Sequence, residues 1–189
     1  MKYLGRVTAF TLVMMGVAGI VSLAQARPDF SGQWAADVGS VAPAGAAPLG
    51  GATAPPSIRG DMGSGWGPAI TIKQDAKQLV VEYVLFSRYD LQPPLQLVYA
   101  PDGSETISDV MIGHTTQERR SRAVWKDQTL EITTIYPSIH PASGKPFTTE
   151  VVQRLRLESP DALVIDVTRR APGAEPSSTR TIYKRSSLK

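Results

Sequence analysis

The sequence predicts an all-β protein, an antiparallel up-and-down meander of about 8–10 strands that forms a closed or nearly closed barrel. Three observations predict this fold. Apolar and polar residues alternate over short segments, turn residues recur about every ten positions, and no segment has the 3.6-residue period of a helix. Hairpins without crossover helices favour a barrel, with a sandwich as the alternative. Closure would also remove exposed strand edges.

Residues 1–26 are predicted to be a cleaved signal peptide. Lys2 and Arg6 make its start positive, residues 7–23 are apolar, and residues 24–26 read Ala-Gln-Ala, the small-x-small pattern of a cleavage site. An uncleaved anchor is the alternative, because about 17 apolar residues lie at the lower limit of a membrane span. Cleavage predicts export of the Gram-negative type, to the periplasm or as a secreted protein.

The remaining residues, 27–189, are predicted to form one β-barrel domain. Its 189 − 26 = 163 residues are enough for a single core. The chain has 20 Lys and Arg against 17 Asp and Glu, and the leader holds two of the cations and no acid, so the domain carries 18 − 17 = +1. So small a charge argues against a nucleic-acid partner. With no cysteine, the chain has no disulfide and no lipoprotein anchor.

The first strand of the domain contains Gly32 and Trp34, directly after Phe30 and Ser31. A glycine followed by a large indole at the start of an all-β chain is suited to plug one end of a barrel. We therefore expect Trp34 to be a structural residue.

Residues 38–67 are predicted to form a long flexible loop after this strand. Gly, Pro and Ala dominate the segment, which has too few large apolar residues to build a core of its own. Loops of this length are usually either lids or disordered. Composition favours disorder, and Trp66 is the residue that could anchor a lid.

Turns at residues 75–76 and 101–103 mark the first two hairpins. A two-residue first turn brings the apolar residues of both strands to one face. The second turn reads Pro-Asp-Gly and joins a strand at residues 95–99 to one around residues 105–111. The neighbours expected in the first hairpin are Ile72 with Leu79 and Ile70 with Val81.

The third and fourth hairpins turn at residues 127–128 and 159–161, and a last strand is expected at residues 180–185. In the fourth hairpin one register aligns the apolar faces and also places opposite charges together. A shift of one residue would lose both charge pairs, so this register is strongly specified. The expected neighbours are Trp125 with Leu130, Ala123 with Ile132 and Ser121 with Thr134 in the third hairpin, and Leu157 with Leu163, Arg154 with Asp166 and Glu150 with Arg170 in the fourth.

Gly32 and Trp34 on the first strand, with Tyr183, Lys184 and Arg185 on the last, resemble the calycins, the small barrels that include lipocalins and fatty-acid-binding proteins. In lipocalins a Gly-x-Trp tryptophan near the closed end is covered by a basic side chain of the final strand. The resemblance implies that Trp34 is the plug and Arg185 (or Lys184) its cover, a cation–π contact of about 0.5–2 kcal/mol. The chain is also similar to exported bacterial proteins of uncharacterised function that open with Phe-Ser-Gly-x-Trp.

Several polar residues continue strand faces that are otherwise apolar. A buried arginine without a partner is costly, so these residues either line a wet cavity or lie at an open rim. In a cavity an arginine would meet the head group of an amphipathic or anionic ligand, whereas at a rim it would be solvated. The candidate ligand-binding residues are Arg119, Tyr136, Gln153, Arg169, Tyr83 and Trp66.

No catalytic set, cofactor or metal site is expected. His114 and His140 lie beside turn residues without a third ligand at metal spacing, and Ser64 lacks the strand–turn–helix context of a hydrolase. We expect a binding protein for a small apolar or amphipathic molecule, which would need a cavity near the usual lower limit of about 300 Å³. The alternatives are a non-catalytic envelope module that docks on a partner protein, through residues 38–67 or an open edge, and, third, an enzyme on a barrel scaffold.

Overall fold

The computed structural model describes residues 27–37, 42–43, 65–84, 94–112, 115–139 and 143–186. The expected signal peptide and both histidines lie outside these residues. The described residues form strands and turns and no helix, so they contain no helix long and apolar enough to cross a membrane.

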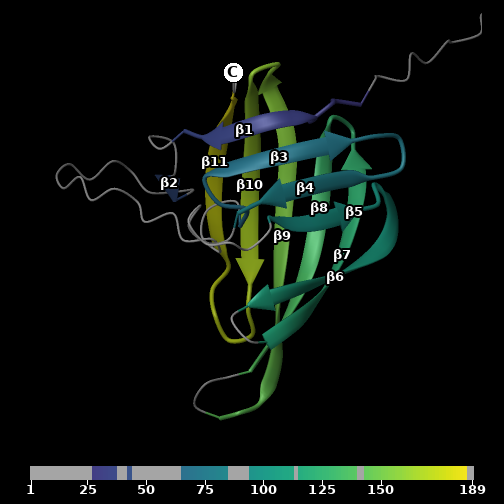
Figure 1. Ribbon diagram of the computed structural model, residues 1–189. Coiled ribbons are helices and arrows are strands. Elements are labelled where there is room, and N and C mark those ends of the chain that lie inside the picture. The colour runs from purple at the N-terminus through teal and green to yellow at the C-terminus, as the bar shows by residue number, and fades with distance from the viewer. Residues whose placement is uncertain are drawn as a thin grey trace, which may run out of the picture.

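Long strands in the second half of the chain form most of the sheet, and β1, β3, β4 and β5 run across them (Figure 1). The strands are β1 (Gly32–Ala36), β2 (Ala42–Pro43), β3 (Ala69–Gln74), β4 (Leu79–Tyr83), β5 (Leu95–Tyr99), β6 (Asp102–Ile112), β7 (Thr115–Lys126), β8 (Thr129–Ile139), β9 (Pro146–Ser159), β10 (Ala162–Arg170) and β11 (Ser177–Arg185).

Ten of these strands pair in the order β5-β4-β3-β1-β11-β10-β9-β8-β7-β6. Every pair is antiparallel, and the first strand pairs with the last, so the meander closes on itself. β5 and β6 remain the two free edges, and they leave one seam of the barrel unsealed. The prediction of an all-β, antiparallel, nearly closed barrel is therefore confirmed.

β2 lies within the expected loop at residues 38–67 and pairs with β11 beyond the end of β1, where Pro43 is opposite Thr179. Residues 38–41 and 44–64 of that segment lie outside the described residues, so its expected flexibility stays a prediction.

The first hairpin has a longer turn than the sequence suggested. Ile72 is opposite Val81 and Ile70 is opposite Tyr83, two residues away from the expected register. The turn spans residues 75–78 because the Asp75 carboxylate accepts the backbone N–H groups of the third and fourth turn residues, at 2.7 and 2.8 Å. A shift of two residues keeps side chains on the same face, so the apolar face is preserved although the predicted register was wrong.

The Pro-Asp-Gly turn at residues 101–103 does not make a hairpin ladder. β5 pairs with β4 and β6 pairs with β7, so this turn joins the two edges of the seam. The register of β6 shifts between Asp102 and Glu105, and Gly103 lies there at φ +88°. A bulge at this position bends its strand. The bend accounts for β6 leaving β5 at the corner instead of pairing with it.

The expected registers of the third and fourth hairpins are confirmed. The ion pairs differ in part, because the barrel supplies further neighbours. Arg170 binds Glu150 at 2.5 Å as expected. Arg154, although opposite Asp166, binds Glu131 of β8 at 2.8 Å, and Asp166 binds Arg180 of β11 at 2.5 Å.

The barrel interior is one continuous apolar core to which strands of both halves contribute. On most strands buried and exposed residues alternate as predicted, whereas Ala162–Ile165 of β10 are buried on both faces, and Arg119 is a charged residue of the interior. Fully buried members include Ile72, Val81, Leu130, Ile132, Leu155, Leu163 and Ile165.

Candidate ligand-binding site

One end of the barrel is closed by Trp34. Its indole is 1% exposed, and Nε1 donates a hydrogen bond to the carbonyl of Phe30 at 2.9 Å. The guanidinium carbon of Arg185 lies 4.4 Å from the centroid of the indole ring. Arg185 Nη1 also donates to the Ser31 carbonyl at 2.8 Å, so the cation is fixed above the ring.

Gly32 is required by this arrangement. Its φ is +139°, and a Cβ added there would collide with the guanidinium of Arg185. The glycine and the tryptophan of the Gly-x-Trp segment are therefore linked through the same arginine, because one leaves room for the cation and the other binds it.

The N-terminal segment crosses this end of the barrel. Phe30 is fully buried and stacks on Trp125, with ring centroids 5.6 Å apart. Gln74 ties the segment to β3, since its Oε1 accepts from the Phe30 N–H at 3.0 Å and its Nε2 donates to the Pro28 carbonyl at 2.9 Å. Arg27 lies over the Trp125 ring at 5.6 Å.

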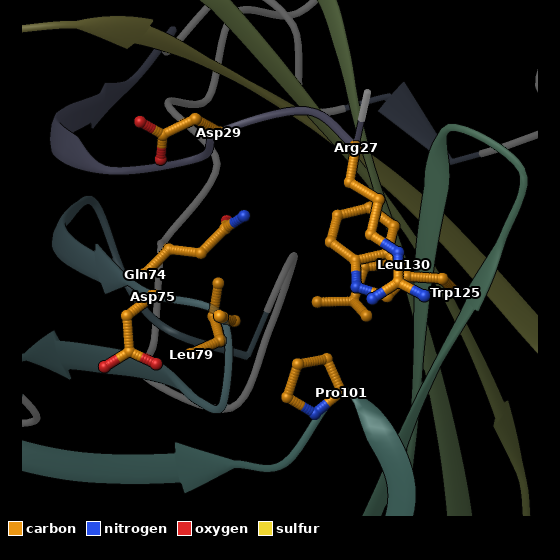
Figure 2. Close-up of a pocket in the computed structure, with 9 residues that line it drawn as sticks. Arg27, Asp29, Gln74, Asp75, Leu79, Pro101, Trp125 and Leu130 are labelled. Carbon is orange, nitrogen blue, oxygen red and sulfur yellow. The ribbon is translucent and has the colours of Figure 1, made fainter. Parts of the chain in front are cut away.

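A cavity of about 230 Å³ remains at this end, between the N-terminal segment and the turns (Figure 2). Its apolar walls include Leu79, Pro101, Trp125 and Leu130. A second cavity, of about 210 Å³, lies along β1, β3 and β4. Neither cavity is lined by Arg119.

Arg119 is the most unusual interior residue. It is only 9% exposed, and its guanidinium carbon lies 4.7 Å from the ring centroid of Tyr136. Its Nε has no hydrogen-bond partner among the described residues. Arg119 and Tyr136 are each six positions along their strands from Trp125 and Leu130, which is about 20 Å in an extended strand. Arg119 is thus far from Trp125 and Leu130, whereas its neighbour Tyr83 lines the second cavity together with Trp34.

The charge of Arg119 acts on the hydroxyl groups of three buried tyrosines. Burial raises the pKa of the Tyr83, Tyr99 and Tyr136 hydroxyls, and the charge of Arg119 opposes this effect at all three. A hydrogen bond from Arg119 also lowers the pKa of Tyr83, and the charge of Arg169 lowers that of Tyr136. The phenols therefore stay neutral at ordinary pH and surround the cations without neutralising them.

Buried polar side chains among the described residues include no carboxylate. Besides Arg119 they comprise one amide and three hydroxyls. The hydroxyls of Ser121 and Thr134 lie 2.8 Å apart, and Thr181 Oγ1 has no hydrogen-bond partner among the described residues. Gln153 is almost fully buried, and Gly65 lies against its amide. This part of the interior is polar and cationic.

Trp66 enters the barrel from outside the sheet. It lies between Gly65 and Gly67, whose φ angles of +84° and +80° favour glycine. The indole is 1% exposed and lies 6.2 Å from the ring of Tyr99. The Tyr183 hydroxyl donates to the Gly67 carbonyl at 2.6 Å and fixes the backbone. Trp66 thus fills interior space beside the tyrosines.

The structure brings most of the candidate residues into one cluster. Arg119 lies over the ring of Tyr136 and forms a hydrogen bond with Tyr83. The charge of Arg169 lowers the pKa of Tyr136, and Trp66 lies against a neighbouring tyrosine of the cluster. That neighbour, Tyr99, was missed, although its alternation with Leu97 on β5 marks it as interior. Gln153 belongs to the same buried face and meets the glycine next to Trp66.

These features define a class of protein, an antiparallel and nearly closed β-barrel with an apolar core and a cluster of buried polar side chains around one buried arginine. Comparison with protein-family models, curated proteins and solved structures finds no match to this chain.

Proposed function

We propose that the protein binds a small amphipathic molecule inside the barrel, with an anionic head group at Arg119. The observation that carries the proposal is the buried guanidinium, 9% exposed, with no carboxylate among the buried side chains that the structure describes. Removing a cation from water is costly unless a counter-charge offsets it. A ligand anion would supply that charge.

The chemistry around Arg119 favours an oxygen anion such as a carboxylate. A guanidinium offers a fork of N–H donors that matches two carboxylate oxygens. Arg119 Nε has no hydrogen-bond partner among the described residues, and the neutral Tyr83 and Tyr136 hydroxyls can add further donors. Arg169, which acts on the same tyrosine, provides a second positive charge.

The apolar part of the ligand would occupy the volume that Trp66 now fills. This indole packs on Tyr99 beside the cluster and is carried by a backbone flanked by two glycines. Glycines give this backbone access to other conformations once the Tyr183–Gly67 hydrogen bond breaks, and the apolar chain of the ligand would replace the buried indole. We propose that Trp66 leaves the interior when the ligand enters, and that binding therefore changes the environment of an indole.

We also propose that the protein is exported and that it is related to calycin-type barrels. Residues 1–26 support export by a cleaved signal peptide, to the periplasm or as a secreted protein. The contact between Trp34 and Arg185, on the first and last strands, supports a relationship to calycin-type barrels.

A calorimetric titration with two ligands of the same chain length tests the proposal. Decanoate carries a carboxylate, and decyltrimethylammonium carries a cation. We expect decanoate to bind about tenfold more tightly or better, because a charged hydrogen-bond pair is made with only one of them. The absence of heat and of any fluorescence change with both ligands would overturn the proposed function.

A further inference from the structure

The free edge of β6 is a surface that no described strand covers. β6 pairs with β7 on one side, and no strand that the structure describes pairs with its other side. The other edge strand, β5, covers only Leu95–Tyr99 and meets β6 at the corner. Backbone N–H and C=O groups along an unpaired edge can accept a further strand.

The outward side chains of this edge form a short acidic row around an apolar residue. Glu105, Ile107 and Asp109 alternate with the inward-facing residues, and all three are exposed. Ile107 is 57% exposed, which is unusual for a large apolar side chain. A strand added here would contact all three residues on one face, because side chains two apart project together.

The charges on this edge are balanced only in part among the described residues, because Glu105 has arginine partners and Asp109 has none. Asp109 lies directly opposite Glu118 of β7, and like charges in this position destabilise a sheet. Arg120 pairs with Glu118 at 2.8 Å and with Glu105 at 3.5 Å, and Arg122 pairs with Glu105 at 3.8 Å. The cations thus lie one strand behind the edge, and an incoming strand would meet the acids first.

A second copy of the chain does not fit this surface well. Antiparallel pairing of two β6 edges about Ile107 would set Glu105 of one copy against Asp109 of the other, and parallel pairing would set each acid against itself. Both arrangements place like charges opposite each other. A peptide with basic residues two positions on either side of an apolar residue matches the row instead.

We propose that the free edge of β6 binds an extended basic segment of a partner protein, which adds to the sheet as a further strand. The apolar residue of the segment lies on Ile107, and its basic residues pair with Glu105 and Asp109. This proposal is independent of the ligand at Arg119, which lies on the interior face of the neighbouring strand.

The test uses end-blocked peptides with the full chain. The peptide TKTVTKT places both lysines and the valine on one face, whereas TTKVKTT has the same composition with the lysines on the opposite face. We expect the first peptide to bind at low salt and to slow hydrogen exchange of the β6 amides at residues 105–112. Peptide binding without protection of these amides, or equal binding of both peptides, would overturn the proposal.

Charge reversal on the protein provides the second arm. The double variant Glu105→Lys with Asp109→Lys should bind TKTVTKT about fivefold more weakly or worse, because two exposed ion pairs become repulsions. The control, Glu158→Lys with Glu175→Lys, makes the same charge change away from the edge and should bind as the unmodified protein does. An equal loss in both variants would indicate non-specific attraction and would contradict the proposal. Self-association in sedimentation that Ile107→Lys abolishes would assign the edge to a second copy instead.

Discussion

The two ends of the barrel interior are built on opposite principles. At the Trp34 end, rings and cations are matched: Arg185 covers Trp34, Phe30 stacks on Trp125, and Gln74 holds the crossing segment. Around Arg119 a buried cation meets neutral phenols and no described buried carboxylate. Side chains that satisfy one another stabilise the fold, whereas a costly group without a counter-charge indicates a ligand.

The largest expected effect comes from removing the plug of the apolar end. Trp34→Ala should lower the free energy of unfolding by about 3–5 kcal/mol, because it deletes a buried aromatic and leaves a cavity. Urea unfolding followed by circular dichroism measures this loss. The preference of the remaining folded protein for decanoate over decyltrimethylammonium should persist. A loss below about 1 kcal/mol would show that Trp34 does not close the barrel.

A smaller loss is expected from the glycine that accommodates the arginine. Gly32→Ala places a side chain at φ +139° and against the Arg185 guanidinium, so it should cost about 1–3 kcal/mol. Gly144→Ala is the control for a positive φ without a collision, because its φ is +64° and nothing lies within 4 Å of an added Cβ, so it should lose less stability. Equal losses in the two variants would mean that backbone strain alone explains Gly32.

Around Arg119 we expect a substitution to leave the free energy of unfolding unchanged or to raise it. Arg119→Met removes a buried charge and keeps a long side chain, so the ligand-free protein should be as stable as before or more stable by about 1 kcal/mol. Urea unfolding measures this change, with the exposed Arg122→Met as the control. A loss of several kcal/mol would show that Arg119 holds the fold together and would remove the contrast between the ends.

The smallest expected difference between the two ends is in how their contributions to the free energy of unfolding depend on pH. The pKa of Asp29 is lowered, mainly by its hydrogen bond to Ser31. Its contribution to the free energy of unfolding is therefore present above the ordinary aspartate pKa of 3.8 and is lost at lower pH. Burial raises the pKa of Tyr83, Tyr99 and Tyr136. Their contribution to the free energy of unfolding is therefore present below pH 10 and is lost as the pH rises above it. Tyrosinate absorbance should therefore show Tyr83, Tyr99 and Tyr136 ionising above pH 10. Ionisation of all tyrosines near pH 10 in the folded protein would contradict the burial of the cluster.

Much of the fold follows from local pattern. The alternation of apolar and polar residues predicts which strand faces lie in the interior. The opposite charges of Glu150 and Arg170 predict the register of the fourth hairpin, which is confirmed. The first hairpin was misjudged because the Asp75 carboxylate extends the turn by two residues. The turn at residues 101–103 was read as a hairpin, since no local signal distinguishes a hairpin from a corner between two sheet edges.

The candidate site was less accessible to sequence reasoning. Arg119 and Tyr136 could be placed on one face, because both continue an apolar alternation. Their proximity to Tyr83 and Tyr99 arises only when the sheet curls and brings β4 and β5 close to β7. The burial of Trp66 likewise depends on contacts with distant strands, which its glycine-rich surroundings do not encode.

Calorimetric titration of decanoate into Arg119→Gln and Arg122→Gln, side by side, tests the anion site at Arg119. Both variants lose one cation of β7, but Arg119 is buried inside the barrel and Arg122 is exposed on its outer face. We expect Arg119→Gln to weaken binding about tenfold or more and Arg122→Gln to bind as the unmodified protein does. Equal affinities of the two variants would contradict an anion site at Arg119.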